Sequence, residues 1–284
     1  MPIVNIEQVW HYYSRGTPLE ARSLSGLNLK ISKGEFLALV GPTGSGKSTV
    51  LQHLNGLLLP HQGRVLINGK DTRDKRFRKN IWSLVGLVMQ YPERQFFEET
   101  VFQEVSFGPK NLGLTNEEIE QRVSEALIIV GLDRKTLWKS SPFALSGGEQ
   151  RRVALASVLA VKTGVLALDE PTAGIDPAGR KRINEALTRL KDEQGVTIVM
   201  SSHNMDDVAK LADRVVVLKD GTTILEGEAR QVFYNYPLIE KAGLDLPFPS
   251  NMARRLEQAC FSVGGRPLTM NEIEDGISDS LSQR

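Results

Sequence analysis

The sequence predicts an α/β protein built on a mostly parallel sheet with helices on both faces. Short, nearly continuous apolar runs bounded by Gly, Asp or Ser are typical of strands buried on both faces, and amphipathic stretches of helical period lie between them. The apolar runs are 36–40, 84–89, 165–168, 196–200 and 215–218, and the helical stretches are 48–58, 117–130, 149–160 and 179–192. Because the two kinds alternate, helices are expected to connect neighbouring parallel strands.

The chain divides into a core and two additions. Residues 91–146 are mainly helical in pattern and interrupt the series of strands, so we expect a helical subdomain inserted into a core domain that spans 1–233. From 234 onward the chain is rich in proline, with a short helical stretch at 252–259 and an acidic, serine-containing end. We interpret 234–284 as a small extension for dimerisation or regulation, with a disordered tail.

The composition excludes several classes of protein. The 284 residues include 35 Lys and Arg against 34 Asp and Glu, a net charge of +1 that gives no support for binding nucleic acid through bulk charge. No apolar run reaches the roughly 18 residues that a membrane-spanning helix needs, and the N-terminus lacks the pattern of a secretory signal. The single cysteine, Cys260, permits no disulfide within the chain. We therefore expect a cytoplasmic protein that does not bind nucleic acid.

A phosphate-binding loop is the strongest motif in the sequence. It fits the pattern G-x-x-x-x-G-K-[ST] and stands between the apolar run at 36–40 and the helical stretch that follows. Its residues are Gly41, Pro42, Thr43, Gly44, Ser45, Gly46, Lys47 and Ser48, and Thr49 comes next. Backbone N–H groups in a glycine-rich turn, with the positive end of a helix, surround phosphate oxygens without obstruction by side chains. Lys47 is expected on the β- and γ-phosphates, and the hydroxyl of Ser48 on Mg²⁺.

Two carboxylates follow the apolar run at 165–168, at the strand end where ligands of open α/β sheets bind. Asp169 is expected to bind Mg²⁺ through water, and Glu170 to polarise the water that attacks the γ-phosphate. An Asp-Glu pair after a strand is also common in solvated turns and helix caps. The phosphate-binding loop in the same chain favours the metal-binding interpretation.

The run LSGGEQ at 145–150 separates the chain from kinases, GTPases and helicases, which share the phosphate loop. Ser146 and Glu149 fit a capping box at the start of a helix. Gly147 and Gly148 leave N–H groups bare at the positive end of that helix, so the same segment can bind a γ-phosphate. With this run the sequence, over about residues 3–230, resembles the ATP-binding cassette (ABC) ATPases. The resemblance implies a P-loop NTPase core of the ABC ATPase type.

The resemblance also implies roles for residues outside the phosphate loop. Tyr13 would stack on the adenine of ATP, with its neighbour Tyr12 as the alternative. Gln90 would contact Mg²⁺ and the attacking water, and His203 the γ-phosphate. Asp176 would contact the opposite subunit, although the three residues before it depart from the family's usual Ser-Ala-Leu.

In ABC ATPases the signature run, here 146–149, completes the ATP site of a second subunit. The resemblance therefore implies a dimer with a second ABC ATPase chain, identical or homologous, in which each chain holds half of two catalytic sites. ATP would close the dimer, and hydrolysis would let it reopen. The implied cofactors are ATP and Mg²⁺, and the implied ligands of the metal are Ser48, Gln90 and Asp169.

The segment after residue 90 carries a narrower resemblance. It places Glu98, Glu99 and Glu104 beside an aromatic cluster formed by Phe96, Phe97 and Phe102. An apolar floor with an acidic rim suits a cytoplasmic helix that carries arginine, whereas a solvated acidic helix packed by its aromatics is the alternative. This stretch, together with the run at 247–250, resembles the ATPases of energy-coupling factor (ECF) transporters, including the related cobalt and nickel importers.

That narrower resemblance implies an ATPase at the cytoplasmic face of the cell membrane that powers uptake of a vitamin or transition metal. Its partners would be a transmembrane coupling protein docked near Glu98, Glu99 and Glu104 and, indirectly, a substrate-capture membrane protein. The ATPase of another ABC importer, for amino acids or a metal, is the alternative. A soluble ABC ATPase would call for a coiled-coil insertion, a second cassette or a basic face, which the sequence lacks. The transported substrate, and whether the dimer pairs identical chains, stay open.

Overall fold

The central element of the fold is a six-stranded sheet with the strand order β10-β9-β3-β8-β7-β6. The structure is a computed structural model that describes residues 2–132 and 135–282. The strands are β3 (Phe36–Val40), β6 (Val85–Val88), β7 (Val165–Asp169), β8 (Thr197–Ser201), β9 (Arg214–Lys219) and β10 (Thr222–Glu228). All neighbours pair in parallel except β10 and β9. The prediction of an α/β core on buried parallel strands is therefore confirmed.

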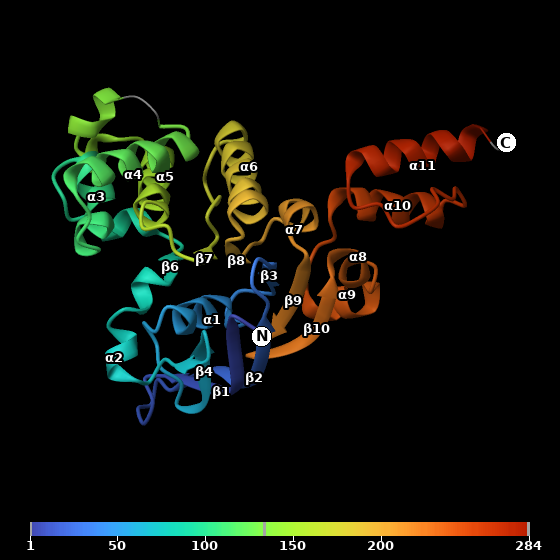
Figure 1. Cartoon of the computed structure of the whole chain (residues 1–284). Coiled ribbons are helices and arrows are strands. Elements are labelled where there is room, and N and C mark those ends of the chain that lie inside the picture. The colour runs from blue at the N-terminus through green and yellow to red at the C-terminus, as the bar shows by residue number, and fades with distance from the viewer. Residues whose placement is uncertain (1, 133–134, 283–284) are drawn as a thin grey trace.

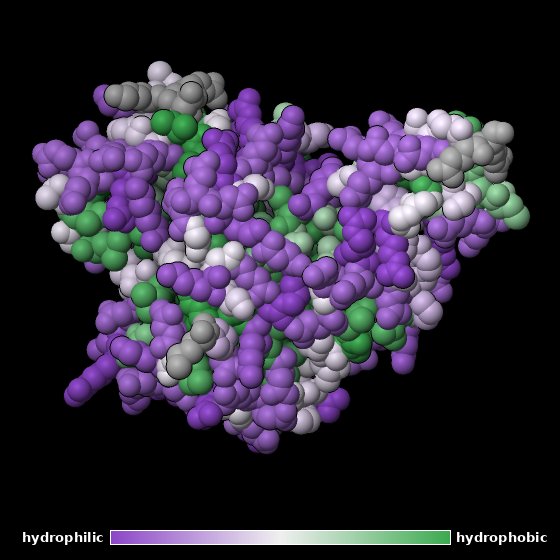
Figure 2. All heavy atoms as spheres, turned by 45° about the vertical axis from the view of Figure 1, so that its right-hand side comes forward, coloured by the Kyte–Doolittle hydropathy of each residue, from purple (hydrophilic) through white to green (hydrophobic). Residues whose placement is uncertain are grey.

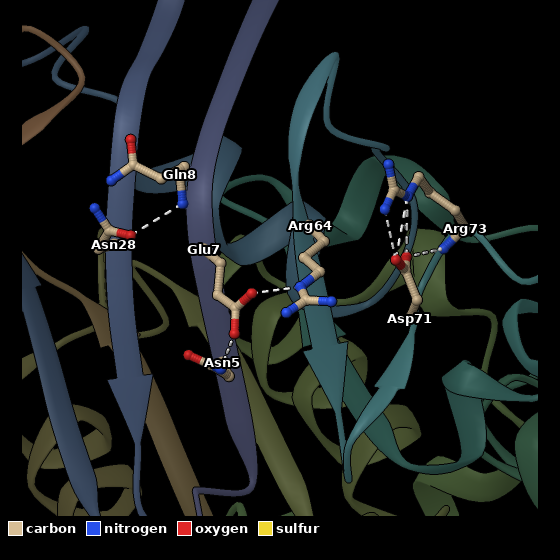
Figure 3. Close-up of polar contacts among 7 residues, drawn as sticks. All are labelled: Asn5, Glu7, Gln8, Asn28, Arg64, Asp71 and Arg73. Carbon is tan, nitrogen blue, oxygen red and sulfur yellow. Dashed lines mark hydrogen bonds and ion pairs between the residues drawn. The ribbon is translucent and has the colours of Figure 1, made fainter.

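A second sheet, which the sequence analysis did not predict, lies beside the first. It is four-stranded and antiparallel, in the order β2-β1-β4-β5. Its strands are β1 (Val4–Tyr13), β2 (Ala21–Ile31), β4 (Gln62–Ile67) and β5 (Lys70–Asp71). Polar side chains bridge neighbouring strands on its surface, as in the ion pair of Glu7 with Arg64 (Figure 3). The inner faces of the two sheets share a core with helix α1 (Lys47–Leu54).

A helical segment connects β6 to β7. It contains α3 (Val101–Asn111), α4 (Asn116–Ile129) and α5 (Gly147–Leu159), and it forms one end of the molecule (Figure 1). Its apolar side chains join a core that continues beneath the parallel sheet to α6 (Pro177–Gln194). The short helices α2 (Lys75–Arg78) and α7 (Met205–Leu211) connect other strands.

The C-terminal part packs in two steps. Helices α8 (Ala229–Phe233) and α9 (Tyr236–Ala242) cover β9 and share a core with its apolar residues. Helices α10 (Phe248–Gln258) and α11 (Met270–Ser282) project from the body and enclose a small core of their own (Figure 1). Helix α11 reaches Ser282, the last residue that the structure describes, and the role of 234–284 in dimerisation or regulation stays a prediction.

The surface seen in Figure 2 is largely hydrophilic, with hydrophobic residues gathered in small separate patches. Among the described residues, no helix combines the length and the apolarity that crossing a membrane requires.

Candidate active site

The phosphate-binding loop lies between the carboxyl end of β3 and the start of α1, as the motif predicts. The Nζ of Lys47 donates hydrogen bonds to the carbonyl oxygens of Gly41 and Pro42, at 2.7 and 3.0 Å, so the loop is wrapped around the ammonium group. Burial lowers the pKa of Lys47, while the charges of Glu170 and Asp169 act in the opposite direction. Burial thus removes water from around the ammonium group of Lys47. Phosphate oxygens can take the place of that water as hydrogen-bond acceptors with negative charge.

The backbone of the loop requires its glycines. Gly46 has φ +103°, and a Cβ there would lie 2.8 Å from the carbonyl oxygen of Ser23. A Cβ on Gly41 would lie 2.2 Å from the carbonyl oxygen of Leu218. The Oγ of Ser45 is buried without a hydrogen-bond partner among the described residues. A cradle without side chains that holds an unpaired buried hydroxyl fits a phosphate group.

A cavity of about 370 Å³ opens above this loop and gathers most of the predicted site. Its lining contains Tyr13, Ala21, Arg22, Ser23, Thr43, Gly44, Ser45, Gly46, Lys47, Ser48, Thr49, Gln90, Glu170 and His203. The elements that contribute are β1, β2, the phosphate loop and the carboxyl ends of β6, β7 and β8. The volume and the convergence of polar groups on one end suit a nucleotide with its phosphates on the loop.

The two acids after β7 are held by the next strand. The Oγ of Ser201, at the end of β8, donates to Oδ1 of buried Asp169 at 2.5 Å. The N–H of Glu170 donates to both the Oγ and the carbonyl oxygen of Ser201, at 3.1 and 3.2 Å. Glu170 itself has φ +50°, a left-handed backbone that is unusual outside glycine. This turn directs its carboxylate toward His203, whose Nε2 lies 3.0 Å from Oε1 of Glu170.

The structure distinguishes the two candidate adenine contacts. The ring of Tyr13 lines the cavity and is 41% exposed, and its hydroxyl lies 3.1 Å from Oγ1 of Thr49. Tyr12 does not line the cavity; its ring faces the guanidinium of Arg15 and the ring of His61. Tyr13 is therefore the aromatic that can meet a base bound above the phosphate loop.

The signature run lies apart from the cavity formed by the same chain. Ser146 and Glu149 form the predicted capping box at the start of α5, with Ser146 Oγ accepting from Glu149 N–H and Glu149 Oε2 accepting from Ser146 N–H. Gly147 and Gly148 have open space where a Cβ would stand. Asp176 caps α6 by accepting from the N–H of Gly179 at 3.3 Å. Neither segment lines the phosphate cavity.

One of the three acids expected on the docking rim is structural. Glu104 is buried, and its Oε2 accepts hydrogen bonds from the N–H groups of Phe97 and Glu98 at 3.2 and 3.1 Å. Burial raises the pKa of its carboxyl, and the two backbone donors lower it by less. Glu104 thus orders the segment that carries Glu98 and Glu99, and it also lines a cavity beside that segment.

A second cavity, of about 430 Å³, opens between that segment and the body of the protein. Leu57, Trp82, Leu87, Met89, Phe107, Val158 and Val161 give it an apolar wall, and Gln95 and Glu104 add polar groups. Phe97 and Phe107 are both exposed and meet edge to face at 4.8 Å. Apolar residues line this cavity, but the aromatic cluster that the sequence indicated, Phe96, Phe97 and Phe102, does not contribute to the lining, and its role in docking stays a prediction.

Two residues near the site were missed by the sequence analysis. Ser201 stands 32 residues after Asp169, and no motif marks it. Arg151 follows the signature run, and its guanidinium contacts Glu93 at 3.6 Å and lies against Gly174 in the loop before α6. An arginine next to the signature is a local signal, whereas the contact of Ser201 depends on the pairing of two strands.

Comparisons with known proteins agree with this geometry. A family model described as ABC transporter matches residues 24–173. The energy-coupling factor transporter ATP-binding protein EcfA2 of Clostridium perfringens (strain 13 / Type A) is 45% identical over 279 residues, which are 98% of each chain. The protein of the same name from Symbiobacterium thermophilum is 46% identical over 100% of this chain and 98% of its own.

Solved structures give the same answer. The structure of cbiO1 from Clostridium perfringens, described as part of the ABC transporter complex cbiONQ, matches 90% of this chain and 99% of its own, with a TM-score of 0.73 at 37% identity. The dimeric ATP-binding cassette MJ0796 bound to ADP and Pi matches 80% of this chain and 99% of its own, with a TM-score of 0.73 at 31% identity. The chain therefore belongs to the ATP-binding proteins of energy-coupling factor transporters, ABC ATPases that couple ATP hydrolysis to transport.

Proposed function

We propose that this chain binds Mg-ATP in the cavity above the phosphate loop and supplies the hydrolysis that drives a micronutrient importer. The observation that carries the proposal is the cavity itself, because Lys47, Glu170 and His203 line one space beside the glycine cradle. Mg²⁺ would be held by oxygen atoms of Ser48, Gln90 and Asp169, the ligand type that it prefers. When bound, the metal neutralises charge on the phosphates.

In this arrangement each side chain of the site has a separate role in ATP hydrolysis. Lys47 binds the phosphates, and Glu170 accepts a hydrogen bond from the attacking water. His203 orients Glu170 through the 3.0 Å contact and lies on the cavity wall within the reach of a terminal phosphate. Ser201 holds Asp169 and the turn at Glu170 in place.

The location of the signature run supports a site completed by a second ABC ATPase chain. Residues 146–149 form the positive N-terminal end of α5, with open space around Gly147 and Gly148, yet they do not line the cavity of their own chain. A second chain that presents these residues would close the open side of the cavity. The partner can be identical or homologous, since this chain contains both halves of the pattern.

The apolar cavity beside α3 is the proposed docking groove for a transmembrane coupling protein, through which a separate substrate-capture membrane protein would be served. Met89 lines this groove, and the next residue, Gln90, lines the nucleotide cavity. A movement of the docked helix would therefore reach the metal site through one peptide bond. Glu98 and Glu99 lie on the segment beside the groove and favour a basic helix. In this proposal the chain works at the cytoplasmic face of the membrane, and the transported substrate is a vitamin or a transition metal.

Substitution of the groove tests this docking proposal. Leu57, 58% exposed, lines the groove, whereas Leu19, 81% exposed, lies far from it in sequence and outside its lining. Leu57→Asp is expected to reduce co-purification of the full-length chain with its membrane complex and to leave ATP binding intact. Leu19→Asp, the matched control, should keep both. Reversal of Glu98 and Glu99 to Lys should also weaken attachment; normal co-purification by Leu57→Asp and by the double reversal would refute the groove.

A further inference from the structure

Three of the four histidines of the chain form a cluster behind the nucleotide cavity. His11 lies on β1, His53 on α1 and His61 just before β4. The ring of His11 meets the rings of His53 and His61 edge to face, with centroids 4.8 and 4.9 Å apart. No step of the proposed reaction uses these side chains, so their assembly calls for a separate explanation.

Two of these rings are buried with an unpaired nitrogen. His53 is fully buried and His11 is 5% exposed. Nδ1 of His53 lies 2.7 Å from the carbonyl oxygen of Thr49, which assigns its proton to that nitrogen. Nε2 of His53 and Nδ1 of His11 are buried without a hydrogen-bond partner among the described residues. Burial lowers the pKa of both, that of His53 to about 4, and the positive charges of the other histidines act in the same direction. Both rings are therefore neutral at neutral pH.

The cluster touches the adenine end of the site through Tyr13. The rings of His11 and Tyr13 meet edge to face at 4.9 Å and 74°. The hydroxyl of Tyr13 lies 3.1 Å from Oγ1 of Thr49, and Oγ1 of Thr49 lies 2.7 Å from Oγ of Ser23. Because the carbonyl oxygen of Thr49 binds His53, the contacts close a circuit that runs from Tyr13 through His11, His53 and Thr49 back to Tyr13.

We propose that His11 and His53 are positioning residues that fix the ring of Tyr13 as a platform for the base of the nucleotide. The circuit restrains Tyr13 at two points. Its hydroxyl contacts Thr49 on α1, the helix that follows the phosphate loop, and its ring packs edge to face against the ring of His11, which limits the orientation of the tyrosine ring. A platform fixed before binding loses little entropy when the base stacks on it. The inference rests on the assignment of Tyr13 to the base, which the proposed function includes.

Protonation should loosen this platform, because none of the described groups that contact the two rings is an acid. The groups that surround His11 and His53 are His61, Tyr13, Thr49 and the backbone of Leu59, and the charges that act on their pKa values come from the histidines themselves. A proton on His11 or His53 therefore places a buried charge without a counter-ion against the other rings. The pKa of each ring is lower in the folded protein than in the unfolded chain. The stability that the neutral rings contribute is therefore complete above the unfolded pKa and is lost as the pH falls from the unfolded pKa toward the folded one.

The experiment measures binding of ATP and of inorganic tripolyphosphate, each with Mg²⁺, to the full-length chain by calorimetry at pH 7.5. The tripolyphosphate reports the phosphate end of the site alone, because it lacks a base that could meet Tyr13. His11→Leu removes the ring contact with Tyr13 and is expected to weaken ATP binding by about 2- to 12-fold, the range that an edge-to-face ring pair supplies. Tripolyphosphate binding should change by less than about twofold. His11→Phe keeps an aromatic ring against Tyr13, so it should restore ATP binding to near the parent value.

Two further variants keep the test decisive. Tyr13→Leu should weaken ATP binding at least as much as His11→Leu, and an unchanged affinity would overturn the platform itself. His53→Asn retains a donor toward the carbonyl oxygen of Thr49 and replaces the ring, so it repeats the test if a His11 variant does not fold. The circuit is refuted if Tyr13→Leu weakens ATP binding while His11→Leu and His53→Asn do not, or if ATP and tripolyphosphate weaken equally. Either result leaves the docking and transport proposals untouched.

Discussion

Removal of the hydroxyl of Ser201 tests whether the support of the two acids is catalytic. Ser201→Ala deletes a buried bond to the carboxylate of Asp169 and an acceptor for the N–H of Glu170. A hydrogen bond to a charged group is worth about 1.5–3 kcal/mol and a neutral one about 1 kcal/mol, so the free energy of unfolding should fall by about 2–4 kcal/mol. If the charge-assisted bond acts in the transition state, its loss alone lowers kcat by about 10- to 150-fold, since each 1.4 kcal/mol is tenfold.

The assay is the initial rate of ATP hydrolysis by the full-length chain in its assembled complex, together with the ATP affinity and the thermal unfolding of each variant. Ser202→Ala is the matched control, because the neighbouring hydroxyl accepts from the N–H of Asn204 and touches neither acid. We expect ATP affinity to stay within about threefold, since the phosphate loop is unchanged. If Ser201→Ala loses stability but keeps the kcat of Ser202→Ala, the hydroxyl of Ser201 has only a structural role and does not contribute to the transition state.

Substitutions at three other positions, with a control at Gly44, test the site and the segment beside it. Glu170→Gln should bind Mg-ATP and form the closed dimer but lose about 10²- to 10⁴-fold in hydrolysis, measured by turnover and size-exclusion chromatography; near-normal turnover would remove it from the chemical step. Glu104→Ala leaves two buried N–H groups without an acceptor and should cost about 2–4 kcal/mol in unfolding free energy. Burial raises the pKa of Glu104 in the folded state, so the free energy of unfolding should decline as the pH rises from the ordinary pKa of a glutamate through the raised one. Glu104→Gln removes this titration and should flatten the decline. A pH profile of stability identical to that of the parent would contradict this prediction. Gly46→Ala, at φ +103° and with its Cβ 2.8 Å from the carbonyl oxygen of Ser23, should abolish ATP binding, whereas Gly44→Ala meets open space and should be milder.

The parallel strands could be predicted because each is buried on both faces. All five residues of β3, and all five of β7, are buried, so each strand appears in the sequence as a continuous apolar run. The strands of the antiparallel sheet show no comparable pattern. Its strands β1 and β2 pair with register shifts on either side of Val9, so the alternation of apolar and polar residues is broken where a pattern search needs it.

The site divides in the same way. The phosphate loop and the signature are each a single unbroken run of residues, so each motif can be identified from the order of its residues alone. Glu104 could not be assigned from sequence, since a glutamate four residues after the helix cap Thr100 looks exposed in the pattern, yet its carboxylate turns back to bind the backbone of 97–98. The histidine cluster is assembled from β1, α1 and the segment before β4, and only the packing of these three elements brings the rings together.

The backbone at Glu170 shows why its support has to come from a neighbouring strand. A left-handed conformation outside glycine costs of order 1 kcal/mol and persists only where the surroundings hold it. Parallel pairing places Asp169 opposite Ser201, so one residue at the end of β8 binds the first acid with its hydroxyl and the turn at the second with its carbonyl oxygen and hydroxyl together. A register shift of one residue between β7 and β8 would deprive both acids of that support. The orientation of the carboxylate of Glu170 toward His203 is therefore a property of the sheet register, and the Asp-Glu motif supplies only the groups that the register positions.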